Sequence, residues 1–248
     1  MKIVFWNILF GFHDMSATRY GGVKLSFWRR DLARDVLTDL DPDIIVLTEA
    51  QWYKREANTP FMDYDRFFKE IGLNYTTFVN EHHEWAYAVG SKKPFDSAIK
   101  IAMPYGEAGA GRFVMNNEIV IDTFHPHPTA VNETKKFLCF KEILKDHDAF
   151  DHYIIGGDFN TTRIAPAQWG YNPTVIPYLE QIGLKDLVAP YNGDLTTFPT
   201  QMDPEQPKVS LDHVFGKGVK VLQSRIVQVQ ECNDVSDHYP IFLEIEKC

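Results

Sequence analysis

Cysteine is scarce in this sequence, and acidic residues outnumber basic ones. The three cysteines, Cys139, Cys232 and Cys248, are widely spaced and form no CxxC pair, which argues against a disulfide framework and a structural zinc site. With 25 basic and 34 acidic residues, the net charge is −9, and the basic clusters are all short. This balance argues against tight non-specific binding to a nucleic-acid duplex. It does not exclude a nuclease, because bound metal cancels part of the local negative charge.

Long apolar runs are also missing. None approaches the ~18 residues of a membrane-spanning helix, so we expect no membrane span. The chain enters a strand-like segment directly after Met1-Lys2, without the apolar stretch of a signal peptide, and we expect a cytoplasmic protein. No linker rich in proline, glycine or serine divides the chain. We therefore expect a single domain over residues 1–248.

Buried strands and amphipathic helices alternate along the chain. Short apolar or alternating runs predict strands at 2–9, 43–48, 75–79, 85–89, 98–103, 112–116, 118–124, 152–156, 209–215, 219–229 and 239–246. Helical periodicity predicts helices at 27–40, 62–71, 133–146 and 173–182. Ser26 and Asn132 are the expected caps of the first and third helices. The fold class is α/β, with two mixed sheets packed face to face and helices outside.

Polar side chains end four of the predicted buried strands. These residues are Asn7, Glu49, the pair Asp158 and Asn160, and the pair Asp237 and His238. Any one of them could be a capping or turn residue. Four such strand ends in one domain favour a common site instead, because an unpaired carboxylate beside a core costs several kcal/mol.

The residue types at these strand ends indicate which cation would bind. Carboxylate and amide oxygens without thiolates suit hard cations such as Mg²⁺, Mn²⁺ or Ca²⁺. His238 needs an acid to orient it, and Asp212 is a good candidate because Asp237 points to the opposite face of the chain. His125 ends another strand and could contact phosphate, whereas His127 is more typical of a loop histidine.

Six short motifs in order along the chain resemble the endonuclease/exonuclease/phosphatase superfamily. The resemblance spans residue 2 to about 245, and the two motifs that carry most of it are GDFN and SDHxP. The matching segments are Trp6-Asn7, Leu47-Thr48-Glu49, Thr123-Phe124-His125, Gly157-Asp158-Phe159-Asn160, Leu211-Asp212-His213-Val214-Phe215 and Ser236-Asp237-His238-Tyr239-Pro240. Thr197-Phe198-Pro199 is also similar to the family's pattern. The family includes pancreatic-type deoxyribonuclease, abasic-site endonucleases, neutral sphingomyelinases and inositol polyphosphate 5-phosphatases.

The resemblance implies a four-layer α/β/β/α sandwich with the site at one rim of the two sheets. It implies a cation, Mg²⁺ or Mn²⁺, held mainly by Glu49, with Asn7 and Asp237 close to it. The implied catalytic residues are Asp158 to orient or deprotonate water, Asn160 to position Asp158 and the phosphate, His238 paired with Asp212, and His125. Arg112 and Lys135 lie where the family often has basic residues that touch phosphate.

The expected function is therefore metal-dependent hydrolysis of a phosphate ester by in-line attack of water. A nuclease acting on DNA or RNA is the first interpretation, and a phosphatase or an esterase of phospholipids or inositol phosphates is the alternative. A non-catalytic binding module is a third interpretation, and the full set of polar residues argues against it. His125-Pro126-His127-Pro128 departs from the apolar residue that many relatives have after this histidine.

Overall fold

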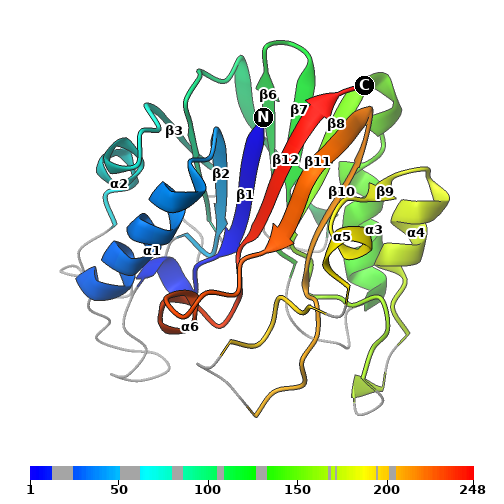
Figure 1. The fold of residues 1–248 in the computed structure, drawn as a ribbon. Coiled ribbons are helices and arrows are strands. Elements are labelled where there is room, and N and C mark those ends of the chain that lie inside the picture. The colour runs from blue at the N-terminus through cyan, green and yellow to red at the C-terminus, as the bar shows by residue number, and fades with distance from the viewer. Residues whose placement is uncertain are drawn as a thin grey trace.

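Two six-stranded mixed sheets form the centre of the structure, and helices connect their strands (Figure 1). The computed structural model describes residues 1–12, 25–50, 62–79, 86–104, 109–126, 133–166, 169–170, 172–193, 195–200 and 205–248. Within these residues, no helix is both long enough and apolar enough to cross a membrane.

The first sheet has the strand order β11-β12-β1-β2-β4-β3. Its strands are β1 (Lys2–Asn7), β2 (Ile44–Thr48), β3 (Tyr75–Val79), β4 (Tyr87–Ser91), β11 (Val219–Ile226) and β12 (Ile241–Lys247). Only β1 and β2 pair in parallel, and helix α1 (Phe27–Leu40) connects them. The neighbouring strand β12 runs antiparallel to β1.

The second sheet repeats this arrangement, with the order β5-β6-β7-β8-β10-β9. Its strands are β5 (Ser97–Ile101), β6 (Ala110–Met115), β7 (Ile119–Thr123), β8 (His152–Asp158), β9 (Lys185–Asp186) and β10 (Asp212–Lys217). Here β7 and β8 form the parallel pair, connected by α3 (Glu133–Ile143), and β10 runs antiparallel to β8.

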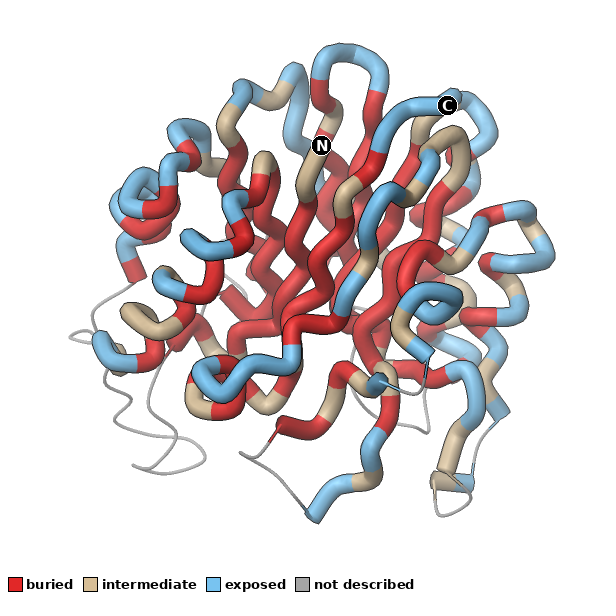
Figure 2. Tube along the Cα trace, viewed as in Figure 1, coloured by how far each residue is buried: buried red, intermediate tan, exposed pale blue. Residues whose placement is uncertain are grey.

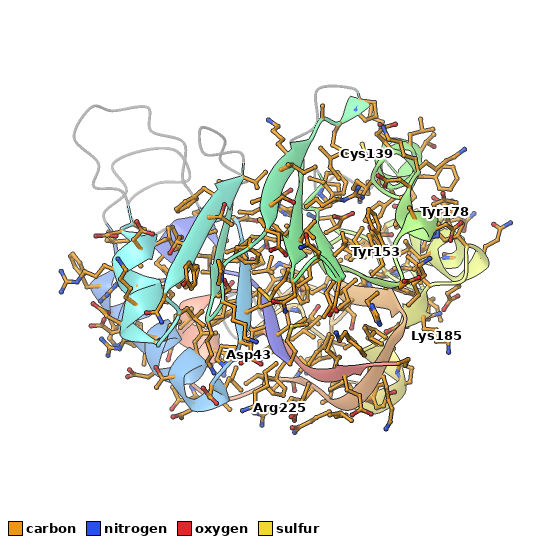
Figure 3. The ribbon with its side chains drawn as sticks, turned by 90° about the horizontal axis from the view of Figure 1, so that it is seen from above. Asp43, Cys139, Tyr153, Tyr178, Lys185 and Arg225 are labelled. Carbon is orange, nitrogen blue, oxygen red and sulfur yellow. The ribbon has the colours of Figure 1, made fainter. Side chains whose placement is uncertain are left out.

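Three hydrophobic clusters separate the layers. The first lies between α1, α2 (Tyr64–Glu70) and the first sheet, and the second lies between the two sheets. The third lies between the second sheet and α3 with α4 (Val175–Gln181). In Figure 3, Tyr153, Cys139 and Tyr178 mark this third cluster, on the far side of the second sheet from Asp43 and Arg225. The central strands β1, β2, β7 and β8 are almost entirely buried, as Figure 2 shows. The predicted α/β/β/α sandwich is confirmed.

The predicted elements match the structure closely along most of the chain. The helix predicted at 27–40 has those bounds, and Ser26 caps it by accepting a hydrogen bond from the Arg29 N–H at 3.3 Å. Asn132, the other predicted cap, lies outside the described residues. Five short elements of the described residues were not predicted: 3₁₀ turns at Phe10–Phe12 and His147–Ala149, strand β9, and helices α5 (Ala189–Asn192) and α6 (Cys232–Val235). Each is too short to produce a periodic pattern.

Strand direction brings six strand termini to one rim. The parallel strands β1, β2, β7 and β8 all end there, and the antiparallel strands β10 and β12 begin there. In Figure 1 this is the lower rim, opposite the two termini of the chain. Asn7 and Asp158 are the last residues of β1 and β8, and Asp212 is the first residue of β10. The predicted polar residues therefore converge because of topology.

Candidate active site

Asp158 lies at the centre of the polar cluster. Its Oδ2 accepts a hydrogen bond from Asn7 Nδ2 at 3.0 Å and lies 3.4 Å from His125 Nε2 and 3.6 Å from His238 Nε2. Its Oδ1 accepts from the Asn160 N–H at 2.8 Å. Burial acts to raise the pKa of this carboxyl, but the two histidines outweigh burial and hold the pKa below its ordinary value. Asp158 is therefore ionised at neutral pH.

Glu49 lies directly after β2, in the left-handed region at φ 52°. Its Oε1 accepts from Asn7 Nδ2 at 3.0 Å and lies 3.5 Å from His125 Nε2, and its Oε2 accepts from the Phe10 N–H at 3.3 Å. Burial raises the pKa of this carboxyl, and the attraction of His125 offsets burial only in part. A buried acid with a raised pKa gains from a nearby positive charge, and a cation can supply that charge in place of the proton.

Asn7 bridges the two acids. Its Nδ2 donates to both Glu49 and Asp158, while its Oδ1 accepts from the Leu9 N–H at 3.0 Å. In this arrangement the amide acts as a donor between two carboxylates, rather than presenting its oxygen as the sequence led us to expect. Asn7 thus holds Glu49 and Asp158, from two different sheets, at one point.

His238 and Asp212 form a buried pair. His238 Nδ1 lies 2.7 Å from Asp212 Oδ2, and both side chains are almost fully buried. Burial lowers the pKa of His238, but the carboxylates of Asp212, Asp158 and Asp237 outweigh it and hold that pKa well above its ordinary value. A protonated imidazole fixed in this way presents Nε2–H as a donor toward the centre of the cluster.

His125 contacts the acids from the side of the second sheet. Its backbone N–H donates to the Tyr87 hydroxyl of β4 at 3.0 Å, which connects the two sheets at this rim. Burial lowers the pKa of the His125 imidazole, and the contacts with Asp158 and Glu49 outweigh burial and raise it. Nε2 of each histidine therefore lies near the same Asp158 oxygen, and the surrounding acids favour the protonated form of both imidazoles.

Asp237 is the most accessible acid of the site, with a side chain 22 % exposed. Its Oδ1 lies 3.9 Å from His238 Nε2. Burial raises the pKa of Asp237, because the attraction of His238 does not compensate for burial and the nearby Asp158 charge. A carboxylate at the edge of the cluster with excess negative charge behind it is suited to share a cation with solvent or substrate.

The donor set fits a divalent cation. Oxygen or nitrogen atoms of Glu49, His125 and Asp158 lie within 4.8 Å of one another, and the same holds for Asp158, Asp212 and His238. Four carboxylates and two histidines leave two negative charges uncompensated even when both histidines are protonated. Burial raises the pKa values of Glu49 and Asp237, so the ionised forms of these two acids are the least compensated by neighbouring positive charge. Oxygen donors of this kind suit Mg²⁺ or Mn²⁺.

Three motif residues to which the sequence assigned no role hold the site in shape. Ser236 Oγ donates to the Asn7 carbonyl at 2.7 Å and accepts from the His238 N–H at 3.2 Å. Trp6 Nε1 donates to the His238 carbonyl at 2.9 Å. Thr197 Oγ1 accepts from the Leu211 and Asp212 N–H groups at 3.0 and 3.1 Å. Ser236, Trp6 and Thr197 all belong to the segments that carry the family resemblance, and this membership was the sequence signal that could have identified them.

Asn160 follows Asp158 in a left-handed conformation at φ 49°. Its backbone N–H is the donor to Asp158, and its side-chain Nδ2 donates to the Pro126 carbonyl at 3.0 Å. Asn160 therefore connects the segment after β8 to the segment after β7. The backbone N–H contacts Asp158, which Asn160 was expected to position, while the side-chain amide, expected to face phosphate, contacts Pro126 instead.

The structure does not bring Arg112 to the cluster. Its guanidinium makes two hydrogen bonds to Asp122 at 2.9 and 2.8 Å, one to Asp146 at 2.7 Å and one to the Ile143 carbonyl at 3.0 Å. These contacts fasten α3 to the outer face of the second sheet. Arg112 was expected to contact phosphate, but its donors bind Asp122, Asp146 and the Ile143 carbonyl instead.

Lys135 is also outside the cluster. It is exposed on α3, whereas its neighbour Lys136 is buried and donates from Nζ to the Asn160 carbonyl. Lys135, which was expected near phosphate, is therefore the exposed lysine of the pair, and the helical phase that exposes it depends on how α3 packs. His127 lies outside the described residues.

Solved structures of similar fold cover nearly all of this chain. An endonuclease/exonuclease/phosphatase from Beutenbergia cavernae has 17% identity and a TM-score of 0.73, over 99% of this chain and 71% of its own. The 3'-5' exonuclease NExo from Neisseria meningitidis has 15% identity and a TM-score of 0.72, over 99% and 100%. The human Nocturnin catalytic domain has 14% identity and a TM-score of 0.70, over 100% and 94%. At these identities the likeness shows the fold alone.

Among curated proteins, no sequence matches this chain. The family model described as the Endonuclease/Exonuclease/phosphatase family matches residues 4–238, which span the whole cluster from Asn7 to His238. The chain therefore belongs to the endonuclease/exonuclease/phosphatase family, whose members hydrolyse phosphate esters.

Proposed function

We propose that this protein is a Mg²⁺- or Mn²⁺-dependent phosphodiesterase whose first substrate class is DNA or RNA. The observation that carries the proposal is the buried Asp158 carboxylate, whose Oδ2 lies 3.4 and 3.6 Å from Nε2 of His125 and His238 and which shares the Asn7 amide with the acid Glu49. A structural ion pair does not need two histidines and three further acids around one carboxylate. A site that must bind both a doubly charged cation and an anionic ester needs acids and histidines together.

The cation would be held by Glu49 and Asp237, with Asn7 beside them. When bound there, it neutralises charge on the phosphoryl oxygens. Its positive charge would also stabilise the ionised forms of Glu49 and Asp237, which burial disfavours. The exposed edge of Asp237 leaves this side of the cluster open to an ester.

Asp158 would orient the attacking water and accept its proton. Because its pKa is lowered, its main contribution is orientation, which can supply ~7–11 kcal/mol of the barrier when the reacting groups are well placed. The water oxygen forms the new bond to phosphorus, the bond to the leaving oxygen breaks, and the leaving oxygen takes a proton from solvent. His238 Nε2–H and His125 Nε2–H donate to the phosphoryl oxygens as their charge grows.

Nucleic acid is proposed as the substrate because relatives of the same fold act on it. NExo from Neisseria is described as a 3'-5' exonuclease and as a 3' phosphatase bound to a product DNA hairpin. An abasic-site endonuclease from Archaeoglobus fulgidus has a TM-score of 0.70 to this chain. The charge of −9 makes tight duplex binding less favourable, so single-stranded DNA is the polymer to test first.

The test is a substrate panel with the purified full chain. Bis-p-nitrophenyl phosphate, single-stranded DNA, supercoiled DNA, RNA and inositol phosphates are incubated with Mg²⁺, Mn²⁺ or EDTA. We expect hydrolysis of the first compound and of at least one nucleic acid, abolished by EDTA. Cleavage of inositol phosphates alone would refute the nucleic-acid assignment and retain the esterase. Intact substrates with folded, metal-loaded protein would refute the hydrolase itself.

Variants of the central acid provide the matching residue-level test. Asp158→Asn should lower kcat by about 10²- to 10⁴-fold, because an amide neither orients the water as the carboxylate does nor accepts its proton. Asp39→Asn, an exposed acid on α1, is the matched control and should leave kcat unchanged. Equal activity in the two variants would show that Asp158 has no role in turnover.

A further inference from the structure

Behind the turn that carries Asp158 lies a buried lysine. Lys136 is 2% exposed, and its Nζ donates to the carbonyl oxygen of Asn160. Its Nζ also lies 3.9 Å from Glu133 Oε2, one turn earlier on α3. Burying an ammonium group costs several kcal/mol, so a lysine in this position is expected where its contacts fix something that function needs.

The carbonyl that Lys136 holds belongs to the residue that orients Asp158. Asn160 adopts φ 49°, a left-handed conformation that is uncommon for residues other than glycine. In this conformation its N–H points back to Asp158 Oδ1 at 2.8 Å while its carbonyl points to α3. A donor on that carbonyl stabilises the conformation in which the N–H meets the carboxylate.

Glu133 holds the other side of the same turn. Its carboxylate accepts from Thr161 Oγ1 at 3.0 Å and from the Thr174 and Val175 N–H groups at 2.8 and 3.3 Å. One turn of α3 thus contacts Asn160, Thr161 and the start of α4 together. This clamp, formed by Glu133 and Lys136, fixes the chain that leaves β8 immediately after Asp158.

We propose that Lys136 is a positioning residue for the hydrolytic reaction, acting on Asp158 through the backbone of Asn160. The inference rests on the proposed function for the part that concerns turnover. In this role Lys136 acts through its hydrogen bond to the Asn160 carbonyl and not on the reacting groups. Its effect is to keep the Asn160 N–H on Asp158 Oδ1, so that Oδ2 stays aimed at the centre of the cluster.

The kinetic test compares Lys136→Met with Lys135→Met on bis-p-nitrophenyl phosphate. Lys136→Met keeps an unbranched side chain, one atom shorter, and removes the donor, and kcat should fall by about 10- to 100-fold with KM within about twofold. Lys135→Met, the exposed neighbour, should match the parent chain. Lys136→Gln, which keeps an N–H donor, should recover kcat to within about threefold of the parent. Assays are run below the melting temperature of each variant.

A double substitution separates positioning from general damage. In an Asp158→Asn background, Lys136→Met should change kcat by less than about threefold, because the residue through which it acts is already altered. A full 10- to 100-fold loss in that background would show that Lys136 acts elsewhere. Unchanged kcat in Lys136→Met alone would overturn the proposal.

Amide hydrogen exchange provides a readout that does not depend on activity. Exchange at the Asn160 N–H should be at least about tenfold faster in Lys136→Met than in the parent chain, while Ile154 in the middle of β8 stays unchanged. Protection that is equal at Asn160 in both proteins would refute the clamp even if no substrate is found. Faster exchange without measurable hydrolysis in the parent would support the clamp and count against the proposed function instead.

Discussion

Three donor side chains surround one carboxylate oxygen of Asp158. Asn7, His125 and His238 all approach Oδ2, and the Asn160 N–H approaches Oδ1. This crowding makes the acid ionised and rigid, and it sets the direction in which a water can be held. A phosphoryl group entering the site would take over the histidine N–H groups and leave Oδ2 free to accept from water.

The Asp212–His238 pair provides a prediction at the scale of residues. Asp212→Asn removes the charge that does most to raise the pKa of His238. The imidazole then loses its proton at lower pH, so the alkaline limb of the pH profile of kcat should move to lower pH, with kcat lower by about 10²-fold or more. The profile is measured on bis-p-nitrophenyl phosphate with saturating metal. An unshifted alkaline limb would show that His238 is not the group that titrates there.

At the scale of elements, the close approach of β1 and β8 brings the two sheets together near the site. Gly156 of β8 lies against the Phe5 ring of β1, and a Cβ at this position would come within 2.7 Å of that ring. Asn7 follows Phe5 by two residues, and Asp158 follows Gly156 by two residues. The close spacing that Gly156 permits therefore lets Asn7 reach Asp158. A side chain here would push the strands apart beneath the cluster.

Gly156→Ala should therefore affect both stability and turnover. We expect a loss of about 1–3 kcal/mol in the free energy of unfolding, since the extra methyl overpacks the core between the sheets. Gly90→Ala in β4 is the matched control, because a Cβ there would meet the Phe68 ring at 2.5 Å, in the outer layer. Both variants should melt earlier than the parent chain, and only Gly156→Ala should also lower kcat. Equal kcat in the two variants would contradict the spacing argument.

At the scale of the whole molecule, each half contributes a parallel strand pair joined by one helix. The pairs β1–β2 and β7–β8 place Asn7, Glu49, His125 and Asp158 at one rim, and the antiparallel strands β12 and β10 add His238 and Asp212. The result is a concentration of buried acids at one end of the sandwich. Such a concentration makes the stability of the protein depend on pH and on cations.

The pH dependence without metal follows from the directions of four pKa shifts. His238 has a pKa raised above 6.5, so its contribution is complete below pH 6.5 and is lost as pH rises through the folded-state value. Glu49 and Asp237, raised above 4.5 and 3.8, likewise stabilise only while protonated. Asp158, lowered below 3.8, contributes above that pH and loses its contribution as pH falls. Chelator-treated protein should therefore be most stable on the acid side of neutrality and less stable toward pH 9.

Metal should reverse the alkaline part of this trend. A cation competes with the protons of Glu49 and Asp237, so saturating Mg²⁺ or Mn²⁺ should raise the melting temperature more at pH 8 than at pH 5. At 100 times the dissociation constant the stabilisation is about 2.7 kcal/mol, which corresponds to roughly 5–10 °C for a chain of this size. The measurement is thermal unfolding with metal or EDTA at both pH values. A shift of the same size at both would argue against these two acids as ligands.

Much of the fold was determined by patterns that are local in the sequence. The helix at 27–40 is specified by its apolar spacing and by Ser26, and the buried strands by short runs of β-branched residues. The polar residues that end those strands, from Asn7 to His238, were conspicuous because carboxylates and amides are costly beside a core. Elements of four residues or fewer, such as α6, were missed because a single turn is too short to repeat a pattern.

The tertiary structure alone decided which side chains meet and which face away. Lys135 and Lys136 are identical in kind and adjacent, yet only the packing of α3 buries the second against Asn160. Arg112 had a suitable charge and position in the sequence, and the placement of Asp122 and Asp146 turned it to the outer layer. The chemistry of a residue is local, so the sequence could specify it. The direction of a side chain depends on contacts between segments far apart in the chain, and those exist only once the two sheets have packed.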